Sequence, residues 1–136
     1  MKKIKILTFL LFSCIFTITA QVKSVYDQYG NAVAYVDFDD EILFSWDNTL
    51  IGYLEANAII AKNGSVICWY ENGIFYDKEG YAIGSLEDAL DMKYNNEEPN
   101  IRSSRQYKPI KAYKVPQSPS FKLKWSQYSF SSVTSD

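Results

Sequence analysis

The densest group of chemically active side chains is the acidic run from Asp37 to Glu41. Carboxylate oxygens at alternating positions can bind calcium. The run lacks the glycine and the ligand spacing of an EF-hand loop, however. We therefore expect a solvated loop between two strands, with cation binding as the alternative.

The composition gives little support to catalysis. The chain contains no histidine, which excludes histidine-based acid–base catalysis, Ser-His-Asp and Cys-His nucleophiles, and histidine metal ligands. No glycine-rich phosphate-binding loop is present. Acidic residues could supply a glycosidase-like carboxylate pair, but none stands in a context that indicates a raised pKa. We therefore expect neither an enzyme nor a cofactor.

Aromatic residues are the best candidates for binding, because they make up much of the apolar content. Exposed aromatic rings can stack on sugars or hold a peptide. The rings predicted to face a ligand are Tyr35, Tyr53 and Trp69. The alternation of the surrounding residues predicts that about half of all such rings point inward, so core packing is the competing interpretation.

These side chains belong to a pattern that occurs four times between Val25 and Leu86. Each unit has an apolar pair, a polar turn and a second strand with period-two alternation, which predicts a β-hairpin. Asp27 and Asp77 begin two of the turns, where a carboxylate can accept hydrogen bonds from backbone N–H groups. The turn positions that favour positive φ are Gly30, Asn48, Gly64 and Gly80.

A small residue follows four positions after each of these turn residues. The small residues are Ala34, Gly52, Cys68 and Gly84. Small side chains are needed where strands converge, and closure of the hairpins would remove exposed strand edges. We therefore predict an all-β fold: four hairpins around a pseudo-four-fold axis, as in a small barrel or propeller. A linear meander is the alternative. Cys68 is expected to be a small buried residue rather than a reactive thiol.

The N-terminus has the layout of a secretory signal peptide. Three lysines precede an apolar run from Ile6 to Phe16, and small residues lead to Ala20. The run is shorter than the roughly 20 residues of a transmembrane helix. Cleavage after Ala20 would give a secreted or periplasmic protein without a membrane span. A lipoprotein anchored at Cys14 is the alternative, although the residues after this cysteine stay apolar.

Charge is unevenly distributed in the predicted mature chain, in which 11 basic residues stand against 16 acidic ones. Residues 21–100 carry a net charge of −11, and residues 101–136 carry +6. We therefore expect the basic tail to pack against the acidic body, with independent solvation of the two as the alternative. The acidic body also disfavours nucleic acid as a partner.

The tail shows two further patterns. Lysines recur at every third residue from Lys108 to Lys114, which matches the period of a polyproline II helix. Phe121, Leu123 and Trp125 alternate with polar residues, which predicts a half-buried strand. The predicted organisation is a signal peptide (1–20), a four-hairpin domain (21–92), a polar linker (93–106) and an extended tail with a closing strand (107–136).

Several of these segments resemble the bacterial 4-fold beta flower proteins. The segments that carry the resemblance are Tyr26–Gly30, Val33–Tyr35, Leu50–Tyr53, Tyr76–Gly80, Lys108–Lys111 and Trp125–Ser126. The third hairpin departs from the pattern, with Ala61 and Lys62 in its turn. The resemblance implies the four-hairpin fold and no assigned activity.

Fold, composition and predicted export together favour a non-catalytic binding or interaction module at the cell envelope. Its partner would be a protein or a glycan. The alternatives are a carbohydrate-active enzyme that uses surface carboxylates and a purely structural envelope component.

Overall fold

The computed structural model describes residues 21–101 and 115–135, which form one sheet and one short helix. The strands are β1 (Val22–Tyr26), β2 (Ala32–Asp37), β3 (Ile42–Ser45), β4 (Leu50–Glu55), β5 (Ala58–Ile60), β6 (Val66–Glu71), β7 (Ile74–Tyr76), β8 (Tyr81–Leu86) and β9 (Lys122–Trp125), and the helix is α1 (Phe130–Thr134). None of the described helices is long and apolar enough to cross a membrane.

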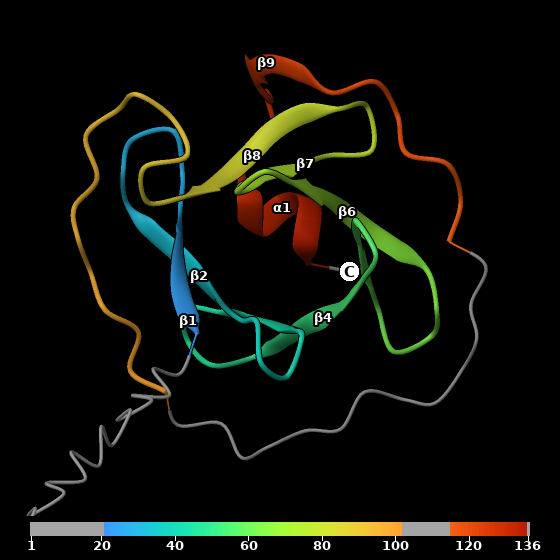
Figure 1. Cartoon of the computed structure of the whole chain (residues 1–136), viewed down its shortest axis with the longest axis horizontal. Helices are drawn as coiled ribbons and strands as arrows, with labels where there is room; N and C mark the ends of the chain where they lie inside the picture. Colours follow the sequence, from blue (N-terminus) through green and yellow to red (C-terminus); the bar gives the residue numbers. More distant parts are fainter. Residues whose placement is uncertain (1–20, 102–114, 136) are drawn as a thin grey trace, which may run out of the picture.

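Strands β1 to β8 form a closed barrel. From β1 to β8, each strand pairs antiparallel with its neighbour in sequence. β1 also pairs with β8, where Val25 lies opposite Leu86 and Tyr26 lies opposite Ser85. Figure 1 shows the resulting ring of strands with α1 in its middle. The all-β, four-hairpin fold class is therefore confirmed, and the linear meander is wrong.

The four hairpin turns have the predicted backbone conformation. Their φ angles are 79° at Gly30, 70° at Asn48, 89° at Gly64 and 90° at Gly80. The Asp77 carboxylate accepts hydrogen bonds from the N–H groups of Glu79 and Tyr81, both at 2.9 Å. Asp27 makes the equivalent pair of bonds in the first turn. The third turn has Ala61 in place of the aspartate, so it keeps only the backbone hydrogen bonds of the other turns. Its Asn63 side chain accepts a hydrogen bond from the Ser65 N–H at 3.0 Å instead.

Each hairpin contains a β-bulge that the sequence pattern did not predict. In the first hairpin, Val25 pairs with Ala34 while Tyr26 pairs with Ala32, so Val33 is the extra residue. The corresponding extra residues of the other hairpins are Ile51, Ile67 and Ile83. A bulge turns two successive side chains toward the same face. The extra residues consequently join the barrel core, where regular alternation would have placed them outside.

Large and small side chains face each other inside the barrel. The first strand of each hairpin carries one large residue that points into the barrel and has 0% exposure. These residues are Val25, Leu43, Ile59 and Phe75. Their cross-strand partners are Ala34, Gly52, Cys68 and Gly84. The predicted small positions therefore lie inside the barrel, where they leave room for the large residue opposite.

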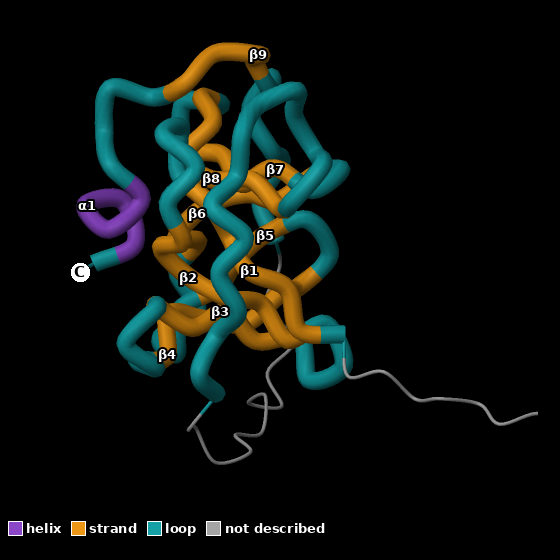
Figure 2. Tube along the Cα trace, turned by 90° about the vertical axis from the view of Figure 1, so that its left-hand side faces the viewer, coloured by secondary structure: helices purple, strands orange, loops and turns teal. Residues whose placement is uncertain are grey.

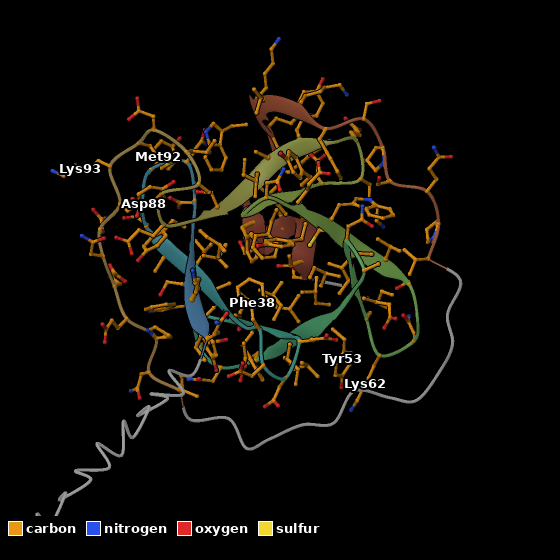
Figure 3. The ribbon with its side chains drawn as sticks, viewed as in Figure 1. Phe38, Tyr53, Lys62, Asp88, Met92 and Lys93 are labelled. Carbon is orange, nitrogen blue, oxygen red and sulfur yellow. The ribbon has the colours of Figure 1, made fainter. Side chains whose placement is uncertain are left out.

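Aromatic side chains close both ends of the barrel. At one end, Phe130 of α1 packs edge-on against Phe75, with ring centroids 6.2 Å apart. Figure 2 shows α1 at this end of the strand ring. Toward the other end, Tyr70 contacts both Phe75 and Phe38, and Phe38 points into the ring in Figure 3. The interior is therefore a packed core.

The chain after β8 wraps the outside of the barrel. Residues 93–101, predicted as a linker, pack beside β1, and β9 runs parallel to β8. β9 confirms the predicted closing strand, but Leu123 is 88% exposed, so its half-buried position was predicted wrongly. The predicted signal peptide, the Lys108–Lys114 tract and five of the seven basic tail residues lie outside the described residues. Docking of the basic tail on the acidic body therefore stays a prediction.

Candidate functional site

The three aromatic residues predicted to face a ligand are buried. Tyr35 is 1% exposed, Tyr53 is 3% exposed and Trp69 is 4% exposed. They point away from the barrel interior, as alternation requires, but the outer face carries apolar clusters of its own. Tyr35 stacks on Phe44 with ring centroids 5.1 Å apart. The ligand-facing interpretation is therefore corrected to outer-face packing.

The acidic run has a local structural role. The Asp37 carboxylate accepts hydrogen bonds from the N–H groups of Asp39 (3.0 Å) and Asp40 (3.1 Å), which shapes the turn between β2 and β3. Within residues 21–101 and 115–135, no three histidine, cysteine or acidic side chains are grouped so that they could hold a metal ion. The described geometry thus gives the cation alternative no support.

A cleft of about 610 Å³ lies between β1 and residues 96–101. Its charged lining residues are Lys23, Glu87, Asp88, Glu97 and Glu98. Val22, Tyr26, Pro99 and Ile101 add apolar surface. In Figure 3, Asp88, Met92 and Lys93 mark the side of the barrel that carries the cleft.

Residues 96–101 form the outer wall of the cleft. Two hydrogen bonds to one carbonyl oxygen in this segment hold the wall in place. The Ser24 hydroxyl donates to the carbonyl oxygen of Glu97 at 2.7 Å, and the Tyr26 hydroxyl donates to the same oxygen at 3.2 Å. Both donors come from β1, so the barrel itself sets the position of the Glu97 backbone. The cleft is consequently a preformed feature of the fold.

Tyr94 anchors the chain before this wall. Its ring packs edge-on against Tyr26, with centroids 5.1 Å apart. Its hydroxyl lies 3.0 Å from the Ser85 hydroxyl and accepts a hydrogen bond from the Leu90 N–H at 3.1 Å. Tyr94 therefore fixes the turn after β8 and the cleft wall relative to each other.

The first hairpin turn holds the same segment. The Asn95 N–H donates to the carbonyl oxygen of Gly30 at 3.0 Å, and the Asn95 amide donates to the Asn31 side chain at 2.6 Å. A Cβ atom on Gly30 would collide with the Lys93 carbonyl oxygen. Glycine is thus required at position 30 for two reasons: the backbone has a positive φ angle there, and the segment that leads to the cleft wall lies too close for a side chain.

The electrostatic potential of the cleft is negative, because four carboxylates stand against one lysine. Burial raises the pKa of Tyr26, and the negative charges of Glu87 and Glu97 raise it further, against the lowering effect of the Ser24 hydroxyl and the Glu97 backbone. The arrangement favours a positively charged ligand.

Sequence reasoning missed the cleft residues. Glu97 and Glu98 stand in a stretch without periodicity, for which the sequence predicted a polar linker. The only sequence signal was the acidic excess of residues 21–100. That signal identifies neither the wall nor its hydrogen bonds to β1, which join residues more than 70 positions apart.

Cys68 is fully buried inside the barrel, and burial raises the pKa of its thiol. The folded protein therefore keeps this proton above pH 9, where the unfolded chain loses it. The free energy of unfolding should then fall by about 1.4 kcal/mol per pH unit above about pH 9 because of this group. Below about pH 9, the free energy of unfolding should not depend on the ionisation of Cys68. Urea unfolding between pH 8 and pH 11 measures the slope.

The control for this prediction is Cys68→Ala, which removes the thiol and keeps a small side chain. Burial also raises the pKa of Tyr26, Tyr70 and Tyr76, so both proteins should lose stability above about pH 10. Only the wild type should show the additional loss that begins near pH 9. Identical slopes for the two proteins would contradict the assignment to Cys68.

The fold and the comparison of the sequence with known families together show the class of this protein. The structure is a closed eight-stranded barrel of four equivalent hairpins, followed by one further strand and a short helix. The 4-fold beta flower protein family matches residues 23–133, and the chain belongs to this family. The resemblance of the hairpin segments is thereby confirmed, and the match extends through β9 into α1. No curated protein and no solved structure matches the chain.

Proposed function

We propose that the protein is a non-catalytic binding module of the cell envelope or the exterior, and that its cleft takes a cationic ligand. The observation that carries the proposal is the preformed cleft, in which Glu87, Asp88, Glu97 and Glu98 surround a volume of about 610 Å³. The predicted signal peptide supports a site of action outside the cytoplasm.

The side chains that line the cleft indicate the chemical class of the ligand. Carboxylates form charge-assisted hydrogen bonds with ammonium and guanidinium groups. Val22, Pro99 and Ile101 offer apolar surface to the methylene groups that carry such charges in lysine and arginine. A lysine-rich or arginine-rich peptide segment combines both features.

Two observations support a role without catalysis. The chain has no histidine to act as a general base. Its buried cysteine is Cys68, which lies in the barrel core and keeps its proton, so it is no nucleophile for a ligand in the cleft.

Isothermal titration calorimetry with trilysine tests the proposal, and the negatively charged triglutamate serves as the control ligand. Trilysine should bind the purified protein, and triglutamate should not. The double variant Glu97→Gln/Glu98→Gln removes two of the four carboxylates without changing their size, so it should bind trilysine about tenfold more weakly.

Glu71→Gln is the matched control, because Glu71 is an exposed carboxylate on β6 outside the cleft lining. It should bind trilysine like the wild type. Equal affinity of the wild type and the double variant would overturn the assignment of the cleft, and absence of trilysine binding would overturn the ligand class.

A further inference from the structure

β9 presents the most exposed large apolar side chain among the described residues. Leu123 is 88% exposed, and exposed lysines stand on both sides of it. Exposed single leucines are common, so exposure alone does not define a binding surface. The backbone around Leu123 provides the additional argument.

The backbone of β9 forms a short arch. Tyr81 and Ala82 are adjacent in β8, but their partners in β9 are Lys122 and Trp125. Leu123 and Lys124 therefore bulge away from the barrel between two fixed points. The fixed points are backbone hydrogen bonds from Lys122 N–H to the Gly80 carbonyl (2.9 Å) and from Ser126 N–H to the Ala82 carbonyl (2.7 Å).

Side-chain contacts hold the same two points. The Ser126 hydroxyl donates to the Asp77 carboxylate at 2.6 Å in a buried position. The Lys122 ammonium group donates to the Glu79 carbonyl at 2.9 Å and lies 4.4 Å from the centroid of the Tyr81 ring. The arch is thus held in one conformation before it meets a partner, which lowers the entropy cost of binding.

We propose that the arch of one molecule, Lys122–Lys124, inserts into the acidic cleft of a second copy of the chain. Leu123 would contact the apolar cleft residues Val22 and Ile101, and Lys124 would meet the carboxylates of Glu97 and Glu98. The inference rests on the proposed function of the cleft and names the cationic segment that it takes.

Charge complementarity favours a second copy of the chain as the partner. The arch carries two lysines, whereas four carboxylates and one lysine line the cleft, so the two surfaces attract each other. The arch cannot reach the cleft of its own molecule, because both of its ends are bonded to β8.

The proposed contact is head to tail. In Figure 1, β9 lies at the top of the ring and residues 93–101 lie along its left side, so the two surfaces are separate. A contact between two different surfaces repeats from molecule to molecule, and it forms a ring or an open chain. The small arch predicts weak association that depends on protein concentration.

Sedimentation velocity of the purified protein at rising concentration tests this inference. The weight-average sedimentation coefficient should rise with concentration at about 20 mM salt and fall back toward the monomer at about 500 mM salt. Leu123→Glu should weaken self-association at least about tenfold, and so should Glu97→Gln/Glu98→Gln.

Mixing these two variants gives the decisive measurement. Leu123→Glu keeps an intact cleft, and the double glutamine variant keeps an intact arch, so the mixture should form one-to-one dimers that neither variant forms alone. Tyr29→Ser is the control, because Tyr29 is 75% exposed and lies outside both surfaces. It should associate like the wild type.

The outcomes separate this inference from the proposed function. Leu123→Glu should still bind trilysine, because Leu123 does not line the cleft. A wild type that binds trilysine but stays monomeric would overturn the inference and leave the function in place. Association that survives in both variants would assign self-contact to another surface. Binding of the monomer to phosphatidylglycerol vesicles through Leu123 would assign the arch to a membrane and also overturn the inference.

Discussion

Replacement of Gly52 by valine is expected to lower the free energy of unfolding by about 3 kcal/mol. Gly52 lies opposite Leu43 inside the barrel. A Cβ atom at this position would lie 2.7 Å from the Ile60 carbonyl oxygen and 3.0 Å from a methyl carbon of Ile59. The nearest obstacle is backbone of the neighbouring strand, so it cannot rotate away as a side-chain end could. Urea unfolding followed by circular dichroism measures the loss.

Leu50→Val in the same strand is the matched control. It also introduces a β-branched residue into β4, but Leu50 is only half-buried, so the cost should stay below about 1.5 kcal/mol. A cost below about 0.5 kcal/mol for Gly52→Val would mean that β4 does not approach its neighbour closely. That result would contradict the packing of large residues against small ones inside the barrel.

The turns and the small inner positions could be predicted from the sequence because both depend on local sterics. Gly30 and Asn48 share a preference for positive φ that few other residues have. Gly52 and Cys68 share a small volume at one repeat position. Four repetitions of each signal outweighed the ambiguity of any single one.

The bulges could not be predicted, because period-two alternation gives no sign of an inserted residue. Val33 and Ile51 are β-branched residues that suit a regular strand as well as a bulge. Only the pairing partners show that they are extra residues. Their inward orientation depends on the partner strand.

The candidate site was predicted least well, because it depends on contacts between distant segments. Tyr53 and Trp69 lie on the outer face, but the sequence pattern could not show that this face is apolar and covered. Val115, Phe121 and Trp125 pack on the cluster that contains Trp69. Long-range packing of this kind decides whether an outward aromatic ring meets a ligand or the protein itself.

Truncation of Phe130 to alanine should lower the free energy of unfolding by about 4 kcal/mol. Phe130 is 3% exposed and packs against Phe75 in the barrel core. Its ring also lies against Gly84, where an added Cβ atom would come within 3.0 Å of it. The variant would open one end of the core, because a helix of five residues has little stability of its own. Thermal and urea unfolding measure the change.

Tyr128→Ala is the control for this prediction, because Tyr128 precedes the same helix but is 53% exposed. Its cost should stay within about 0.5 kcal/mol. A similarly small cost for Phe130→Ala would mean that α1 is an appendage and that the eight strands bury their core without it. A large, cooperative loss would instead show that the chain beyond the last hairpin completes the barrel. Residues 115–135 would then fold together with the four hairpins, as expected for a family match that extends to residue 133.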